Sequence, residues 1–301
     1  MGIASAMSAI SLATSQPASA ASYPAALISH YEGNADTSTL MTQGKNDATS
    51  AGNNQGYVVE ILDFGRPAYN SGCTCYGTIA INTGNWLSNS SILAAVKAYS
   101  DGWASKHLSG TKVMVSIGTS NNCFGCFPDR LSGFSAFGTY WAERTRELAA
   151  YMATHNYVNQ RAWAAFDLEP AWDSQYTDSK DMINAYDTAA RSGTGYVPVY
   201  ADYGSADSSW TQKQIWNLSY AVTTALAFPE IYYPYQQNMA TEWQGVYQWA
   251  EVNGHKDYIF GSTDNYYANT CTLTPDETYN YLLSYINKWQ KSMTYAVRYP
   301  C

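Results

Sequence analysis

The sequence predicts an α/β protein in which a single (β/α)8 barrel, lacking its last helix, spans residues 22–301. Eight short apolar segments typical of strands alternate with seven longer segments of helical spacing. This alternation is typical of parallel strands covered by helices. No linker, low-complexity tract or block of charge divides the chain, and 301 residues suit one such barrel. A doubly wound open sheet is the alternative, although no Gly-x-Gly-x-x-Gly follows the first strand to bind a dinucleotide.

The composition narrows the classes of function. Hydrophobic residues make up 46% of the chain, charged residues only 13%, and the net charge is −8. An acidic chain with few cations is a poor binder of phosphate backbones, so we expect no nucleic-acid partner. No run of eighteen apolar residues predicts a membrane span. The 27 tyrosines and 10 tryptophans combine apolar faces with polar tips. Such side chains suit sugar rings, although most of them must fill the core.

The first residues predict export. Residues 1–21 are weakly apolar and end in Ala18-Ser19-Ala20, which resembles a signal-peptidase cleavage site. We interpret them as the remnant of a signal peptide and exclude them from the fold. We therefore expect a secreted protein. We also expect it to be a monomer.

The first half of the chain supplies four strand–helix pairs. Val and Ile enrich the segment 57–64, as in a buried strand. Ile92, Leu93, Val96 and Trp103 have helical spacing, whereas Thr, Asn and Gly weaken a helix over 36–51. A long loop is expected between Gly65 and the second helix. The expected strands are 25–32, 57–64, 112–118 and 162–169, and the expected helices are 36–51, 90–107, 134–155 and 179–191.

The second half continues the alternation. Gly193 marks the end of the fourth helix, and Gly254 that of the sixth. Thr274 followed by Pro275 predicts the start of the last helix, because Thr caps helices and Pro suits the first helical position. The expected strands are 196–202, 229–235, 258–264 and 294–299, and the expected helices are 208–223, 239–253 and 275–291.

The six cysteines follow strands and predict disulfides. An even number of cysteines in an exported protein favours disulfide bonds over metal binding. The alternative is a four-thiolate metal site made by Cys73, Cys75, Cys123 and Cys126. In a barrel the loops after the second and third strands are neighbours. We therefore expect Cys73 and Cys75 to bond to Cys123 and Cys126, and Cys271 to Cys301.

Polar side chains gather where the predicted strands end. Asp167 and Glu169 are two residues apart at the end of the fourth strand, so they point to the same side. A structural acid pair bound to backbone amides is the alternative interpretation. Glycosidic cleavage needs a carboxylic acid and a second group at the anomeric carbon. We expect Glu169 to be the acid and Asp167 its partner. The other expected substrate-binding residues are Glu32, Asp63, Trp172, Tyr200, Asp202, Tyr233, Tyr235, Gln236 and Asp264.

Other reactions find less support. Only His30 among the four histidines ends a strand, and the chain has no Gly-x-Ser-x-Gly elbow of a serine esterase. We expect no metal and no cofactor.

Two short motifs resemble known glycoside hydrolases. Val115-Ser116-Ile117-Gly118 resembles the Ser-x-Gly strand of family 18, the chitinases, and Asp167-Leu168-Glu169 resembles the end of that family's acidic motif. Asp-x-Glu on the fourth strand and Val199-Tyr200 on the fifth are also similar to family 25 lysozymes and to related actinobacterial barrels. The resemblance implies that Glu169 is the proton donor and Asp167 its partner, and that Tyr233 or Tyr235 positions the substrate.

Three functions remain open. The first is a secreted glycoside hydrolase that acts on a polysaccharide or a cell-wall glycan. The second is a lectin-like barrel that binds glycan without cleaving it, which is favoured by Ala162 and Ala165 at the positions of two family 18 aspartates. The third is a secreted phosphodiesterase, which would need a metal and a role for His30 and Glu32.

Overall fold

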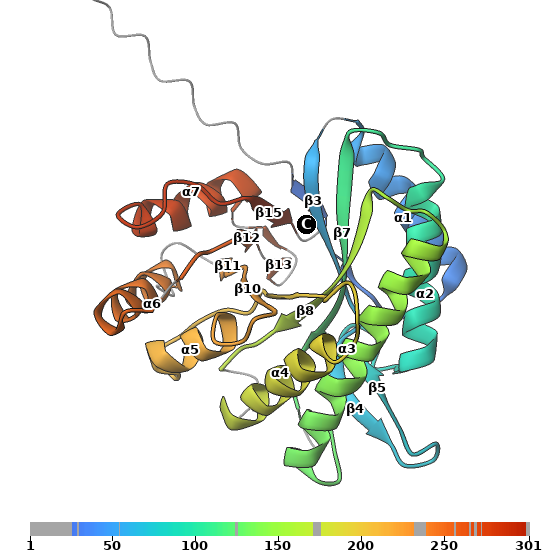
Figure 1. Ribbon diagram of the computed structural model, residues 1–301, viewed down its shortest axis with the longest axis horizontal. Coiled ribbons are helices and arrows are strands. Elements are labelled where there is room, and N and C mark those ends of the chain that lie inside the picture. The colour runs from blue at the N-terminus through green and yellow to red at the C-terminus, as the bar shows by residue number, and fades with distance from the viewer. Residues whose placement is uncertain are drawn as a thin grey trace, which may run out of the picture.

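The protein is of the mixed α/β class, as predicted. The structure is a computed structural model and describes residues 26–28, 30–53, 55–123, 126–170, 176–231, 239–255, 257–264, 266–267, 270–271 and 273–298. Within these ranges the parallel strands lie at the centre and seven helices lie outside them (Figure 1). No helix in the described part of the chain has the length and apolar character needed to cross a membrane.

The larger sheet has six strands, and every neighbouring pair is parallel. Its order is β10-β9-β8-β7-β3-β2, so the strands follow one another in space largely as they do in sequence. The bounds are β2 His30–Tyr31, β3 Gly56–Asp63, β7 Thr111–Ser120, β8 Gln160–Asp167, β9 Tyr200–Asp202 and β10 Ala225–Ala227.

A second parallel sheet has the order β1-β15-β12-β11. Its strands are β1 Ala26–Ile28, β11 Glu230–Ile231, β12 Gly261–Asp264 and β15 Tyr295–Arg298. The amide of Phe260 donates to the carbonyl of Ala227 at 2.9 Å, which links the chain before β12 to β10 of the larger sheet.

Helices follow the strands and cover them. Side chains cap several of the helix starts: the Asp36 carboxylate accepts from the Thr39 amide at 2.7 Å, and Thr274 and Glu277 form a reciprocal capping box. The prediction of a helix start at Thr274 and Pro275 is therefore confirmed. The helices are α1 Thr37–Ala51, α2 Asn89–Ala104, α3 Arg130–Thr154, α4 Tyr176–Arg191, α5 Gln212–Ser219, α6 Met239–Asn253 and α7 Pro275–Ile286.

The expectation of a long loop after Gly65 is wrong. Three antiparallel strands fill this segment, β4 Arg66–Asn70, β5 Cys75–Ile79 and β6 Trp86–Ser88. Gly65 makes the sharp exit from β3 possible, because its φ is +96° and a Cβ there would lie 2.2 Å from the Ile79 carbonyl oxygen. A second small antiparallel pair joins β13 Tyr266–Tyr267 to β14 Thr270–Cys271.

The disulfides are local, which corrects the expected pairing between loops. Cys73 bonds to Cys75 in the turn between β4 and β5, and Cys123 bonds to Cys126 after β7, with Cα atoms 5.2 and 5.1 Å apart. The two loops are neighbours, as expected, but a backbone hydrogen bond of 2.9 Å from Tyr69 to Cys126 links them. The side chain of Cys271 and all of Cys301 lie outside the described residues.

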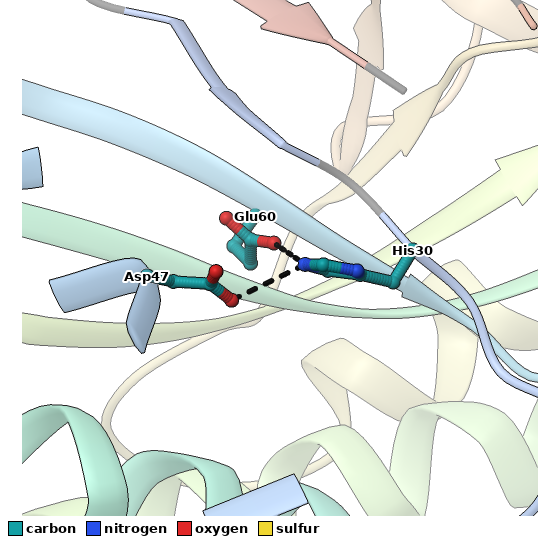
Figure 2. Close-up of side chains that lie close together, drawn as sticks. All are labelled: His30, Asp47 and Glu60. Carbon is teal, nitrogen blue, oxygen red and sulfur yellow. Dashed lines mark hydrogen bonds and ion pairs between the residues drawn. The ribbon is translucent and has the colours of Figure 1, made fainter. Parts of the chain in front are cut away.

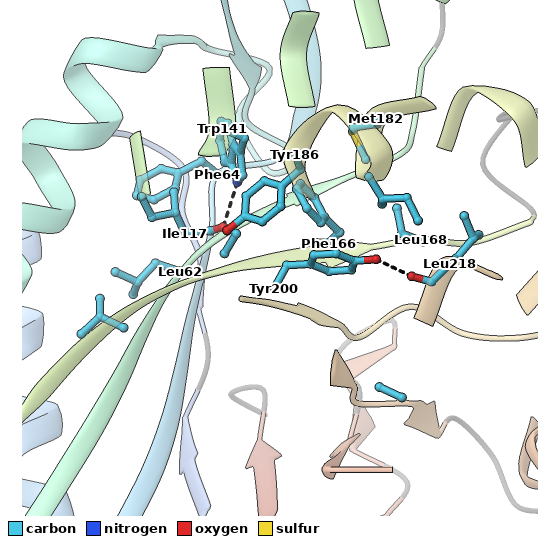
Figure 3. Packing of buried hydrophobic residues seen from close by; sticks show 14 of the residues in the cluster. Leu62, Phe64, Ile117, Trp141, Phe166, Leu168, Met182, Tyr186, Tyr200 and Leu218 are labelled. Atoms are coloured by element: carbon cyan, nitrogen blue, oxygen red, sulfur yellow. Dashed lines mark hydrogen bonds between the residues drawn. The ribbon is translucent and has the colours of Figure 1, made fainter. Parts of the chain in front are cut away.

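Both faces of the parallel strands are buried. Successive side chains along a strand point to opposite faces, so the position of a polar residue in its strand decides on which face it lies. On β3, Val58 and Leu62 belong to a helix-facing cluster, while Val59 and Ile61 belong to a cluster on the opposite face. Figure 3 shows part of the helix-facing cluster, in which the Trp141 indole donates to the Ile117 carbonyl at 2.9 Å. The opposite-face cluster draws on both parallel sheets, through Trp163 of β8 and Tyr295 of β15.

Candidate functional site

Four acidic side chains gather beyond the opposite-face cluster. Asp63 ends β3 and Asp167 ends β8, each on the face that carries the preceding members of that cluster. Glu169 lies two residues beyond Asp167. Glu230 belongs to β11, where its neighbour Ile231 packs in the helix-facing cluster. We call Asp63, Asp167, Glu169 and Glu230 the acid group.

Three of these carboxylates are close together and buried. Asp167, Glu169 and Glu230 each offer one oxygen, and the three oxygens lie within 4.8 Å of one another. The side chains are almost enclosed, with 0% of Asp167, 4% of Glu169 and 0% of Glu230 exposed. Like charges at such distances in a medium of low polarity repel strongly, so the group retains at least one proton near neutral pH.

Asp167 holds a proton more firmly than an ordinary aspartate does. Neither of its oxygens has a hydrogen-bond partner among the described residues. Burial raises the pKa of Asp167 well above its usual range, and the charges of Glu169, Glu230, Asp63 and Asp202 raise it further. The raised pKa favours the protonated form of this carboxyl group, which can donate a hydrogen bond.

Asn121 fixes the chain on which Glu169 is carried. This residue follows β7, and its amide side chain accepts from the Glu169 amide at 3.1 Å and donates to the Glu169 carbonyl at 3.0 Å. Its own backbone amide donates to the Asp167 carbonyl at 3.0 Å. The Ser205 amide reaches Oε1 of Glu169 at 3.3 Å. The segment after β8 is thus held from both neighbouring strands.

Asp63 has two hydrogen-bond donors. The Tyr203 hydroxyl donates to Oδ2, and the Gly65 amide donates to Oδ1 at 2.6 Å. Burial nevertheless raises the pKa of Asp63 to about 6. Burial also raises the pKa of nearby Glu32, whose Oε1 accepts from Gln43 at 2.8 Å. Glu32 adjoins Asp63 through a backbone hydrogen bond of 2.7 Å.

Tyr200 and Asp202 lie apart from the acid group, on the side of β9 that packs against α5. The buried hydroxyl of Tyr200 donates to the Leu218 carbonyl, and the Ser219 hydroxyl donates to Asp202 at 2.5 Å. Burial raises the pKa of Asp202 to about 7, against the hydrogen bonds from Ser219 and the Gly204 amide. Neither side chain lies on the face of β9 that carries the opposite-face cluster, because their neighbours Ala201 and Tyr203 lie there.

The structure does not describe the side chains of several expected site residues. Trp172, Tyr233, Tyr235 and Gln236 lie outside the described residues, and of Asp264 only the backbone, at the end of β12, is described. Glu230 and Asn121 were not expected. The sixth strand was expected to begin at Pro229, so Glu230 was placed at the start of a strand and not at its end. In the structure this strand is divided into β10 and β11, and Glu230 lies in β11, the later part.

Two groups in the described residues have the composition of a metal site. The oxygens of Asp167, Glu169 and Glu230 suit a hard cation such as Mg²⁺ or Ca²⁺, and His30 with Asp47 and Glu60 offers a nitrogen and two oxygens.

The chemistry that the acid group supports is proton donation by one carboxyl beside a second, ionised carboxylate. No known family model matches this sequence, and no curated protein matches it.

Proposed function

We propose that the protein is a glycoside hydrolase in which Glu169 protonates the leaving oxygen of a glycan. The observation that carries this proposal is the buried trio of Asp167, Glu169 and Glu230, with oxygens within 4.8 Å of one another. Such a group holds a proton and a negative charge side by side, which glycosidic cleavage needs.

The proposal includes a closed (β/α)8 barrel made from the two parallel sheets. A single residue separates β1 of the smaller sheet from β2 of the larger, and two residues separate β10 from β11. The two sheets also share the opposite-face cluster. These features support eight strand positions around one interior, with the acid group at the carboxyl ends of the strands, where barrel enzymes hold their chemistry.

Glu169 is a better proton donor to a substrate than Asp167. It is the most exposed of the trio, at 4%, and the Ser205 amide orients one of its oxygens. Asp167 is fully buried and its pKa is raised, so it can serve as a source of a proton beside Glu169. Glu230 or Asp63 is the second catalytic group, which acts at the anomeric carbon. The short separation of the trio favours retention of configuration, because inverting enzymes need a wider gap for water.

The substrate class follows from the sequence. Asp167-Leu168-Glu169 and Val115-Ser116-Ile117-Gly118 resemble motifs of families 18 and 25. These resemblances and the expected export favour a polysaccharide or a cell-wall glycan outside the cell.

Glycan binding without cleavage is the second candidate. Ala165 occupies the face of β8 that carries Asp167 and belongs to the opposite-face cluster, so an aspartate expected of a chitinase is replaced there by a small apolar residue. The near-complete burial of the acids also favours a binding surface above them rather than contact with the reacting bond.

The test compares the wild-type protein with Glu169→Gln on chitin, peptidoglycan, and neutral α- and β-glycans, with released sugars read by mass spectrometry. Glu143→Gln, on the exposed side of α3, is the control. Release by the wild type and by the control, and little release by Glu169→Gln, supports the proposal. Release that survives in Glu169→Gln removes Glu169 from the acid role. Binding of one glycan without release favours the lectin-like candidate, and loss of activity with a chelator favours a metal-dependent hydrolase.

A further inference from the structure

A second polar group lies on the opposite side of β3 from Asp63. It consists of His30 on β2, Asp47 on α1 and Glu60 on β3, which we call the histidine–acid triad (Figure 2). Figure 2 shows both carboxylates directed at one edge of the imidazole ring. The His30 Nε2 atom lies 3.2 Å from Oδ2 of Asp47 and 3.3 Å from Oε1 of Glu60.

One proton on His30 cannot satisfy both carboxylates. The contact with Asp47 has hydrogen-bond geometry, whereas Glu60 has no hydrogen bond to either oxygen among the described residues. Glu60 is 0% exposed. A buried carboxylate with no donor is strongly unfavourable unless a cation neutralises it.

The surroundings of the triad supply one neutral hydrogen-bond donor and a further negative charge. Tyr99 on α2 donates its hydroxyl to Oδ2 of Asp47 at 3.0 Å, and the charge of Glu32 acts on Glu60. Burial and the charges of Asp47 and Glu32 raise the pKa of Glu60 to about 8, although His30 opposes this shift. Burial lowers the pKa of His30, but Asp47 and Glu60 together raise it to about 10. The triad therefore attracts positive charge beyond one imidazolium proton.

We propose that His30, Asp47 and Glu60 form a binding site for a divalent transition-metal ion, with Zn²⁺ as the representative ion. One imidazole nitrogen and two carboxylate oxygens are ligands that Zn²⁺ accepts. Ligands at about 2.0–2.1 Å from a tetrahedral ion lie roughly 3.3 Å apart. The two nitrogen–oxygen separations of 3.2 and 3.3 Å match that spacing.

The surroundings of the triad suit an ion that enters from solvent. The His30 side chain is 23% exposed, whereas Glu60 is fully enclosed, so solvent reaches the triad at His30. Tyr99 orients the Asp47 carboxylate, which is the role of a neighbour that supports a metal ligand. A bound ion would join β2, β3 and α1. This site is separate from the acid group, so the proposal does not depend on glycan cleavage.

The test removes metal from the purified full-length protein with a chelator and then titrates it with Zn²⁺ by calorimetry. We expect one strong site with a dissociation constant of about 1 µM or tighter. His30→Gln should weaken binding at least ~100-fold because a ligand is lost. His155→Gln, at an exposed histidine, and Asp167→Asn, in the acid group, should leave it unchanged.

A second measurement needs no variant. Co²⁺ added to the chelator-treated wild-type protein should give the intense visible absorption of a four-coordinate ion, and Zn²⁺ should abolish it. Glu60→Gln, which removes a charge with little change of shape, should lose this spectrum. Absence of a stoichiometric site in the wild type, or binding that survives in both His30→Gln and Glu60→Gln, would overturn the proposal and leave the triad as a protonated ion pair. Loss of glycan cleavage in Glu169→Gln tests the other proposal separately.

Discussion

The acid group and the histidine–acid triad bury carboxylates on opposite faces of one strand, and they balance the charge differently. Asp63 and Glu60 are three residues apart on β3, yet Asp63 lies with the acid group and Glu60 with the triad. In the triad an imidazole lies between two carboxylates. At Asp167, by contrast, the side chains that act on the carboxyl are all acids, and they raise its pKa.

The difference indicates two uses of buried charge. A carboxyl that is neutralised by its own proton can give that proton away, which suits chemistry. A carboxylate that is neutralised by a cation holds elements together and has no proton to give. Substitutions at Glu169, His30 and Asp167 separate these two uses.

The largest expected effect is on activity. Glu169→Gln should lower the rate of glycan cleavage by about 10²–10⁴-fold, because the proton donor is lost. Glu60→Gln is a matched control, since it removes an equally buried glutamate from the triad and should leave the rate nearly unchanged. Rates measured on the best substrate of the glycan panel decide this. An equal fall in both variants would show that lost stability, rather than lost chemistry, explains the result.

The next effect is on stability. His30→Gln, in chelator-treated protein, should lower the free energy of unfolding by about 3 kcal/mol, because the buried contacts of His30 with Asp47 and Glu60 are lost. The partial exposure of His30 keeps this figure at the lower end of the range for buried pairs. Urea denaturation at pH 7 measures it, with His155→Gln as the control. A change below about 0.5 kcal/mol, typical of surface substitutions, would mean that water rather than His30 balances the triad.

Asp167→Asn should change the free energy of unfolding in the opposite direction. At pH 7 it should raise the free energy of unfolding by roughly 2 kcal/mol, because buried Asp167 must either take up a proton on folding or be buried with its charge, whereas asparagine does neither. The folded pKa is raised, so the wild type is penalised increasingly as the pH rises above the unfolded pKa of about 4. The gain should therefore disappear near pH 4 and be present at pH 7. A loss of stability at pH 7 would indicate that a cation or a hidden donor stabilises ionised Asp167.

The sequence predicted the strands and the acids that end them, because a buried parallel strand is an apolar run and its first polar residue stands out. Asp63, Asp167 and Glu169 were identified in this way. Glu60 was not, because it lies inside the run Val58-Val59-Glu60-Ile61 and its partners come from distant segments. Glu230 was missed because the sixth strand is divided. The sheet β4-β5-β6 was missed because its Gly-rich and Cys-rich sequence resembles a loop.

The smallest expected effect concerns the hydrogen bond that Tyr203 donates to Asp63. Tyr203→Phe should lower the free energy of unfolding by about 1 kcal/mol and raise the pKa of Asp63 above about 6, because the hydroxyl stabilises the ionised form. Tyr200→Phe is the matched control, since it removes a buried hydroxyl from the helix-facing side of β9. Tyr200→Phe should lower the stability by a similar amount without changing the pKa of Asp63.

Carbon NMR titration of the Asp63 carboxyl gives the pKa. If Asp63 is the second catalytic group, the acidic limb of the activity profile moves up in Tyr203→Phe alone. An unmoved limb beside a raised pKa assigns that role to Glu230.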